Sequence, residues 1–205
     1  MKNSSATVSR QPSVFCAKSV EKFTKLCYND LDKSEFAEMM QVKKLIILRG
    51  NSGSGKTTIA KELQQLLGRN TMVISQDVVR REMLYVRDGE NTLALPLLTE
   101  LLKYGNMNCD IVILEGILNS SWYRPLFEYA VKIYESNVFA YYFDIPFEET
   151  VKRHNSRPQR NEFSEDDMRK WWKEKDCSAV LNEIIITKDK DKDSIVKEIY
   201  SRVNN

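Results

Sequence analysis

Short apolar runs recur along the chain from residue 43 onward, and stretches in which apolar residues keep helical spacing separate them. The runs occupy residues 45–48, 71–75, 109–115, 138–143 and 183–187. Short continuous apolar runs bounded by turn residues are typical of strands that are buried on both faces. Their alternation with helices predicts an α/β fold, a three-layer sandwich with a five-stranded parallel sheet between helices.

Helices are expected between these strands. They run from the glycine-rich turn after the first strand to residue 67, and over residues 78–86, 93–104, 122–135, 147–154, 164–176 and 194–203. The apolar residues on one face of the first helix are Ile59, Ala60, Leu63, Leu66 and Leu67. Gly105 is expected to end the helix at 93–104, and Ser164 is a candidate cap for the helix that follows it.

Residues 1–42 lie outside this alternating pattern. Residues 1–12 are polar and predict a mobile tail, whereas apolar residues further on fit two short helices. No candidate chemistry occurs among them. The sequence therefore divides into a polar tail with short helices of unknown role at 1–42 and one domain at 43–205.

A glycine-rich turn after the first strand is the strongest chemical signal in the chain. Gly50, Gly55, Lys56 and Thr57 fit the pattern G-x-x-x-x-G-K-[ST]. The glycines let successive backbone N–H groups point at a polyphosphate, and the following helix adds the positive end of its dipole. Lys56 can then reach the β and γ phosphates, and Thr57 can offer its hydroxyl to Mg²⁺. The turn predicts nucleotide binding by Gly50, Asn51, Ser52, Gly53, Ser54, Gly55, Lys56, Thr57 and Thr58.

Two acidic residues stand at the ends of predicted strands. Asp77 follows the strand at 71–75, and Glu115 closes the strand at 109–115. Ligands of parallel α/β sheets bind beyond the carboxyl ends of the strands, so both side chains are expected to face the phosphates. We interpret Asp77 as the catalytic base, with a helix N-cap as the other interpretation. Glu115 fits the Walker B acid that supports Mg²⁺, with a solvated strand end as the alternative. The candidate metal site is Thr57, Asp77 and Glu115.

Three arginines after a predicted helix are candidates for a lid. Arg153, Arg157 and Arg160 surround Pro158. Arginine offers planar, permanently charged donors that suit phosphate oxygens, so a lid that closes over the triphosphate is expected near residues 153–163. A solvated basic turn at a helix carboxyl end is the alternative.

Two further features are candidates for contacts with a phosphate acceptor. Arg80 could grip an anionic or polar acceptor, or it could form a surface salt bridge on its own helix. Trp171 and Trp172 could stack on a base, although core packing is the commoner role of such residues at helical spacing.

The composition excludes several classes of site but does not indicate a binding partner. The formal charge of +2 is too small to indicate a nucleic-acid or membrane partner. The four cysteines form no C-x-x-C pair and His154 is the single histidine, so no zinc site is expected. No apolar run approaches the roughly 18 to 20 residues that span a bilayer, and the first residues lack the apolar core of a secretory signal. A cytoplasmic protein is expected.

Several segments match a known family. They are residues 50–58, SQD at 75–77 with Arg80, ILEG at 113–116, FDIPFEETVKRH at 143–154, Arg157-Pro158, and the tryptophan pair followed by Asp176. With them the chain resembles the P-loop kinases of the nucleoside and nucleotide kinase group, in particular bacterial uridine kinase-like proteins. It resembles polynucleotide kinase and the zeta-toxin kinases more distantly. The resemblance implies the strand order 2-3-1-4-5, an arginine-bearing lid, and transfer of the γ phosphate of ATP to a hydroxyl.

The expected activity is therefore Mg²⁺-dependent phosphate transfer from ATP to an alcohol group of a small molecule, with a nucleoside-like acceptor favoured. Catalysis is assigned to Lys56, Asp77, Arg153 and Arg157. Acceptor binding is assigned to Asp77, Arg80 and Glu115.

Other functions stay open or are disfavoured. A kinase for 5′-hydroxyl polynucleotides would place lysines and arginines beside Asp77 and would bind with strong salt dependence. A zeta-toxin-like sugar-nucleotide kinase and a non-catalytic, ATP-binding regulatory protein are further alternatives. A switch GTPase is disfavoured because residues 115–116 and 187–190 lack its motifs, and a mechanical ATPase of the AAA type because the chain is too short. The acceptor and the oligomeric state are not predicted.

Overall fold

The protein contains a five-stranded parallel sheet. The computed structural model describes residues 43–155 and 164–205. The strands are β1 (Lys44–Gly50), β2 (Thr71–Ser75), β3 (Ile111–Gly116), β4 (Val138–Asp144) and β5 (Ile184–Thr187). They pair in the order β2-β3-β1-β4-β5, and every pairing is parallel. The predicted sheet and its strand order are confirmed.

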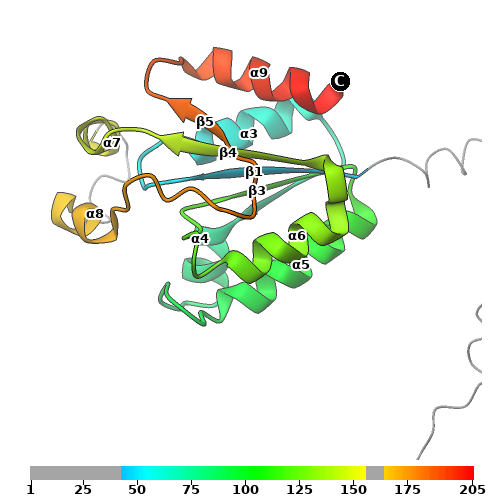
Figure 1. The fold of residues 1–205 in the computed structure, drawn as a ribbon, viewed down its shortest axis with the longest axis horizontal. Helices are drawn as coiled ribbons and strands as arrows, with labels where there is room; N and C mark the ends of the chain where they lie inside the picture. Colours follow the sequence, from blue (N-terminus) through cyan, green and yellow to red (C-terminus); the bar gives the residue numbers. More distant parts are fainter. Residues whose placement is uncertain (1–42, 156–163) are drawn as a thin grey trace, which may run out of the picture. The chain divides into compact units, whose positions relative to one another are not determined.

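Helices cover both faces of this sheet, which gives the predicted three layers. Two short turns are η1 (Val79–Met83), which is π-helical, and η2 (Glu135–Asn137), which is 3-10 helical. The α-helices are α3 (Lys56–Leu67), α4 (Gln76–Val78), α5 (Ala94–Asn108), α6 (Arg124–Tyr134), α7 (Phe147–Asn155), α8 (Glu165–Trp171) and α9 (Lys192–Asn204). Figure 1 shows α3 and α9 on one face of the sheet and α5 and α6 on the other.

The central strand β1 is apolar because both of its faces are covered. Its residues Leu45, Ile46, Ile47 and Leu48 are fully buried. Leu45 and Ile47 pack in the cluster that includes the buried side chains of α5 and α6. Ile46 and Leu48 point to the other face and pack with those of α3 and α9. The unbroken apolar run is thus the consequence of burial on both sides.

Two helix features differ from the sequence interpretation. Gly105 does not end a helix, because α5 continues to Asn108. A Cβ atom on Gly105 would lie 2.5 Å from Cγ2 of Val112, so this glycine instead lets α5 approach β3 closely. Leu66 was expected on the buried face of α3 but is 51% exposed, whereas Leu67 is partly buried and packs against the core as expected.

Two predicted helices are shorter than expected. The chain passes from β2 directly into α4 and η1, which end at Met83 rather than at residue 86. The helix after Ser164 ends at Trp171, since the backbone of Trp172 is extended. No helix in the described part of the chain is long and apolar enough to cross a membrane. The predicted tail at 1–42, and Arg157 and Arg160 of the predicted lid, lie outside the described residues.

Candidate active site

The phosphate-binding turn lies between β1 and α3, at the edge of the sheet where the parallel strands have their carboxyl ends. Gly50, Gly53 and Gly55 have φ angles of 142°, 79° and 102°, which side chains rarely allow. A Cβ atom would also lie 2.7 Å from the Phe143 carbonyl oxygen at Gly50, and 2.7 Å from that of Thr150 at Gly53. Glycine is therefore required here by backbone conformation and by close contact with β4 and α7.

Lys56 lies inside this turn. It is the first residue of α3 and is 6% exposed. Its Nζ donates to the carbonyl oxygen of Asn51 at 2.8 Å and to Oγ of Ser54 at 3.1 Å. The ammonium group thus lies beside the backbone that would surround a phosphate, and the amino end of α3 adds a second source of positive potential.

Thr57 and Glu115 are joined across the site. The Thr57 hydroxyl donates to Oε2 of Glu115 at 3.1 Å. Glu115 is 3% exposed near the end of β3, beside Ser75 of β2 in the strand register. A hydroxyl and a carboxylate are oxygen donors of the kind that Mg²⁺ accepts, and Mg²⁺ retains several water ligands. Thr57 and Glu115 could therefore hold this ion, although the described residues contain no group of three acidic, histidine or cysteine ligands.

Asp77 lies in the first turn of α4. The N-cap is Ser75, so the alternative interpretation of Asp77 as the cap is wrong. The Asp77 side chain is half exposed, and its Oδ1 accepts a hydrogen bond from Nη2 of Arg80 at 2.7 Å. Arg80 thus forms the salt bridge on its own helical segment that was one of its two interpretations. Its Nε is buried without a hydrogen-bond partner.

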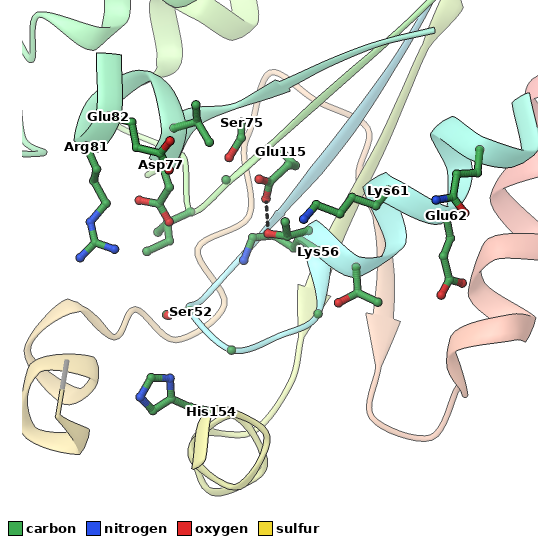
Figure 2. A pocket seen from close by; sticks show the side chains of 18 residues that line it. Ser52, Lys56, Lys61, Glu62, Ser75, Asp77, Arg81, Glu82, Glu115 and His154 are labelled. Carbon is green, nitrogen blue, oxygen red and sulfur yellow. Dashed lines mark hydrogen bonds between the residues drawn. The ribbon is translucent and has the colours of Figure 1, made fainter. Parts of the chain in front are cut away.

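Two of the predicted catalytic residues, Lys56 and Asp77, and the predicted metal ligands line one cleft of about 670 Å³. Figure 2 shows Lys56, Asp77 and Glu115 around this cleft, and Thr57 also lines it. His154, from α7, also lines the cleft and is 3% exposed. Sequence reasoning considered His154 only as a zinc ligand, and its place in the segment at 143–154 was the available signal.

Arg153 lies on the other side of the turn. Its Nη1 donates to the carbonyl oxygen of Ser54 at 3.3 Å, and its Nε donates to Glu149 at 2.9 Å. Hydrogen bonding from Arg153 lowers the pKa of Glu149. Arg153 lines a separate hollow of about 340 Å³, formed with residues 188–192, that meets the main cleft at Gly55.

A third hollow, of about 450 Å³, adjoins the main cleft on the side of Asp77. Ser52, Asp77, Arg81 and Ile117 line both. A molecule in this hollow would therefore have direct access to Asp77 and to the phosphate-binding turn. Arg80, Trp171 and Trp172 also line it, so Asp77, Arg80 and the tryptophan pair meet here. Glu115, which was also assigned to acceptor binding, lines the main cleft instead.

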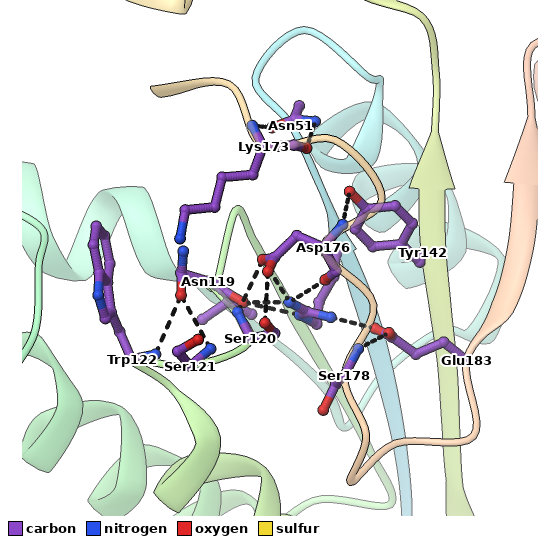
Figure 3. Close-up of polar contacts among 12 residues, drawn as sticks. Asn51, Asn119, Ser120, Ser121, Trp122, Tyr142, Lys173, Asp176, Ser178 and Glu183 are labelled. Atoms are coloured by element: carbon purple, nitrogen blue, oxygen red, sulfur yellow. Dashed lines mark hydrogen bonds and ion pairs between the residues drawn. The ribbon is translucent and has the colours of Figure 1, made fainter. Parts of the chain in front are cut away.

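Asn51 has a contact that the sequence pattern did not indicate. Its Nδ2 donates to the carbonyl oxygen of Lys173 at 2.7 Å, and the Lys173 backbone N–H donates to its Oδ1 at 3.1 Å. Figure 3 shows this pair of bonds. The Asn51 side chain thus ties the phosphate-binding turn to the segment after α8.

Arg49, just before the turn, is the charged residue that sequence reasoning missed. It is completely buried, and donates to Glu183 at 2.6 Å and to Asp176 at 3.2 Å. It also donates to the carbonyl oxygen of Leu118 at 2.9 and 2.7 Å. Asp176 accepts two further bonds from Ser120 (Figure 3). An arginine directly after an apolar run was the only local signal for this buried network.

Solved structures share this fold. A gluconokinase from Sinorhizobium meliloti has a TM-score of 0.60 at 13% identity, with 80% of this chain and 93% of that chain covered. The tunicamycin resistance protein of Deinococcus radiodurans has a TM-score of 0.55 at 15% identity, with 79% and 96% covered. The APS kinase CysC of Mycobacterium tuberculosis has a TM-score of 0.51 at 17% identity, with 80% and 98% covered.

These similarities establish the fold, and the narrower resemblance to uridine kinase-like proteins is not confirmed by them. No curated protein matches the sequence. Residues 45–176 match the family model AAA_33, which is described as an AAA domain. Since this match includes more than half of the chain, the protein belongs to the AAA_33 family.

Proposed function

We propose that the protein is an ATP-dependent kinase that transfers the γ phosphate to a hydroxyl group of a small molecule. The observation that supports this proposal best is the position of Asp77. It lines both the phosphate cleft and the adjoining hollow of about 450 Å³. An acceptor in that hollow would present its hydroxyl between Asp77 and the phosphate-binding turn, as in-line transfer requires.

Each predicted residue has a role in this proposal. Lys56 and the backbone N–H groups of the turn bind the β and γ phosphates. Thr57 and Glu115 would hold Mg²⁺, which neutralises phosphate charge when it is bound. Asp77 orients the acceptor hydroxyl and accepts its proton, with its ion pair to Arg80 fixing the carboxylate.

Arg153 and Arg157, the arginines of the predicted lid, are proposed to contact ATP rather than the acceptor. Arg153 is hydrogen-bonded to the turn and lines the hollow beside residues 188–192, which we assign to the nucleoside of ATP. Arg157 is proposed to close over the phosphates.

The acceptor class is also a proposal, and a nucleoside-like acceptor is favoured because aromatic side chains line the acceptor hollow. A 5′-hydroxyl polynucleotide or a sugar nucleotide is the alternative acceptor. A regulatory protein that binds ATP without catalysis is the alternative of another class. We favour the kinase over this alternative because a regulatory protein would not need a carboxylate, Asp77, that lines both the phosphate cleft and a second hollow. A mechanical ATPase remains disfavoured, since the described residues form one sheet with its helices and no second helical domain.

The test is ADP release from Mg-ATP with a panel of nucleosides, nucleotides, sugars, aminoglycosides and 5′-hydroxyl oligonucleotides. The wild type is compared with Asp77→Asn and with Arg124→Gln, a control on the exposed face of α6. We expect acceptor-dependent release that falls by about 10²–10³ in Asp77→Asn, the effect of removing one catalytic contact of this kind. Unchanged release in Asp77→Asn would remove Asp77 from the mechanism. Tight ATP binding without stimulation by any acceptor would favour the regulatory protein.

A further inference from the structure

The hollow beside Asp77 is rich in cationic and aromatic side chains. It is lined by Ser52, Asp77, Arg80, Arg81, Arg87, Asp88, Ile117, Asn119, Trp122, Lys170, Trp171, Trp172 and Lys173. Five of these residues are cationic and two are acidic. The whole chain has 31 basic and 29 acidic residues and a formal charge of +2. The lining of this hollow is therefore more basic than the chain as a whole.

The two acidic residues leave much of this positive charge available. Asp88 accepts hydrogen bonds from the neutral groups Tyr123 Oη at 2.6 Å and Gln76 Nε2 at 2.9 Å. Asp77 pairs with Arg80 through one guanidinium nitrogen, while Nε of Arg80 is buried without a partner. Nη1 of Arg80 donates to the carbonyl oxygen of Val86 at 3.4 Å, so among the described residues its buried Nε is the one guanidinium nitrogen left unsatisfied.

Two cations at this hollow have no carboxylate partner among the described residues. The exposed side chain of Arg87 makes no ion pair or hydrogen bond there. Nζ of Lys173 lies 5.1 Å from the centre of the Trp122 ring, and the Lys173 backbone is fixed by Asn51. Arg87 and Lys173 are therefore placed to bind an anion that enters the hollow.

Aromatic surface accompanies the charge. The chain has three tryptophans, and all three line this hollow. Trp172 is fixed by an edge contact with Phe147 at 5.0 Å between ring centres, and Trp122 lies against Lys173. Ring faces at the wall of a small hollow suit the flat base of a nucleotide or the apolar face of a sugar.

We propose that this hollow is the acceptor site and that the acceptor is a small hydroxyl compound with a ring and an anionic group, such as phosphate or carboxylate. This inference rests on the kinase function proposed above. Arg87 and Lys173 bind the anionic group, and the tryptophans contact the ring. Guanidinium groups suit both phosphate and carboxylate oxygens.

The lysines and arginines expected beside Asp77 in a polynucleotide kinase are present in this hollow. The size of the hollow nevertheless favours a small anion over a nucleic acid. A polynucleotide is bound along its backbone by a track of cations. Here the cations surround a hollow of about 450 Å³, and the chain as a whole is nearly neutral. That volume is typical of a small-molecule site.

Tryptophan fluorescence tests the proposal without turnover, because every tryptophan of the chain lines the hollow. The full chain, saturated with Mg²⁺ and a non-hydrolysable ATP analogue, is titrated with matched pairs. Each pair is a neutral ring compound and its charged form: uridine and uridine monophosphate, adenosine and adenosine monophosphate, glucose and glucuronate. We expect the charged member of at least one pair to change the emission with an affinity at least about tenfold higher, which corresponds to one charge-assisted contact.

Substitutions of Arg87 and Lys173 test whether these two cations cause the tighter binding of the charged compound. Arg87→Gln and Lys173→Gln should each reduce that preference by about tenfold, while affinity for the neutral member stays the same. Arg124→Gln, an exposed α6 arginine paired with Glu128, is the matched control and should bind like the wild type.

The outcomes separate this inference from the proposed function. If the ATP analogue binds but neutral and charged members bind equally, or none changes the emission at millimolar concentration, the anionic acceptor is overturned and the kinase proposal stands. Tighter binding of a 5′-hydroxyl oligonucleotide, with a steep salt dependence, would replace the small acceptor by a nucleic acid. If the ATP analogue itself does not bind, the proposed function fails, and the acceptor site with it.

Discussion

Arg49 and Arg87 are both close to the candidate active site, but the protein uses their charges differently. Arg49 is fully buried, and its guanidinium donates to two carboxylates and to backbone oxygens. Arg87 is exposed at the wall of the acceptor hollow, without a side-chain partner among residues 43–155 and 164–205. A cation whose donors are all occupied by the protein holds the fold together, whereas one with spare donors in a hollow is available to a ligand.

The Arg49 network fixes the segment that shapes the acceptor hollow. It joins β1 to the carbonyl oxygen of Leu118 and to Asp176 and Glu183, which lie before β5. The same segment begins near Lys173, which Asn51 binds. The buried network and the Asn51 contact thus hold the two sides of the site at the carboxyl edge of the sheet.

The largest expected effect on stability is that of Arg49→Gln. It leaves the nearly buried Glu183 and Asp176 without their cation, and breaking a buried ion pair costs about 3–5 kcal/mol. Urea unfolding measures this loss. The matched variant Arg87→Gln should change the free energy of unfolding by less than about 0.5 kcal/mol. Equal losses in the two variants would contradict the distinction between them.

Lys56→Ala tests a buried cation that we propose binds the phosphates of ATP. Lys56 contacts neutral oxygens of its own turn, and the proposal gives its charge to the phosphates. We expect a loss of about 3–4 kcal/mol in transition-state stabilisation, measured as kcat/KM for ADP release. Lys103→Ala on the exposed surface of α5 is the control. Lys56→Ala with full activity would show that the turn is not the phosphate site.

Asn51→Ala should have a smaller effect, both on the stability of the fold and on binding of the acceptor. It removes the two hydrogen bonds to Lys173, which together stabilise the fold by about 1–3 kcal/mol. Because Lys173 then loses its fixed position, the KM for the acceptor should rise more than the KM for ATP. Asn106→Ala, which removes a side-chain bond to the Ile133 carbonyl oxygen, is the matched control for stability alone. Equal changes in both KM values would contradict a role of Asn51 in placing Lys173.

The smallest expected effect concerns hydrogen bonds at the protein surface, in the capping box of α8. Hydrogen bonds from the Ser164 side chain and backbone lower the pKa of Asp167 to about 2, from an ordinary 3.8. Since the folded-state pKa is depressed, this contribution to stability is present above pH 3.8 and is lost as the pH falls through about 2. Ser164→Ala should therefore raise the pKa of Asp167 toward 3.8, as an NMR titration of its carboxyl group would measure. An unchanged pKa would contradict this cause.

The sheet and the phosphate-binding turn could be predicted because their signals are local. Strands buried on both faces are continuous apolar runs, and the glycines of the turn are required by the backbone itself. Strand ends also placed Asp77 and Glu115 at the correct edge. The strand order came from the resemblance, since nothing in the runs themselves encodes it.

The contacts that complete the site are long-range and left little trace in the sequence. Asn51 and Lys173 are 122 residues apart, and Arg49 and Glu183 are 134 apart. Gly105 shows the same difficulty in a helix, because a glycine that permits close packing looks like one that ends a helix. Trp122 and Arg87 meet the tryptophan pair and the adjacent Lys173 only in the folded chain.

The most direct test of the kinase proposal follows the phosphate itself. Wild-type protein and Asp77→Asn are incubated with Mg-ATP labelled at the γ phosphate and with the acceptor that stimulates ADP release best. The account predicts that the label moves to a hydroxyl of the acceptor in the wild type and about 10²–10³ more slowly in Asp77→Asn. Label released only as inorganic phosphate, at equal rates in both proteins, would identify an ATPase and contradict the account.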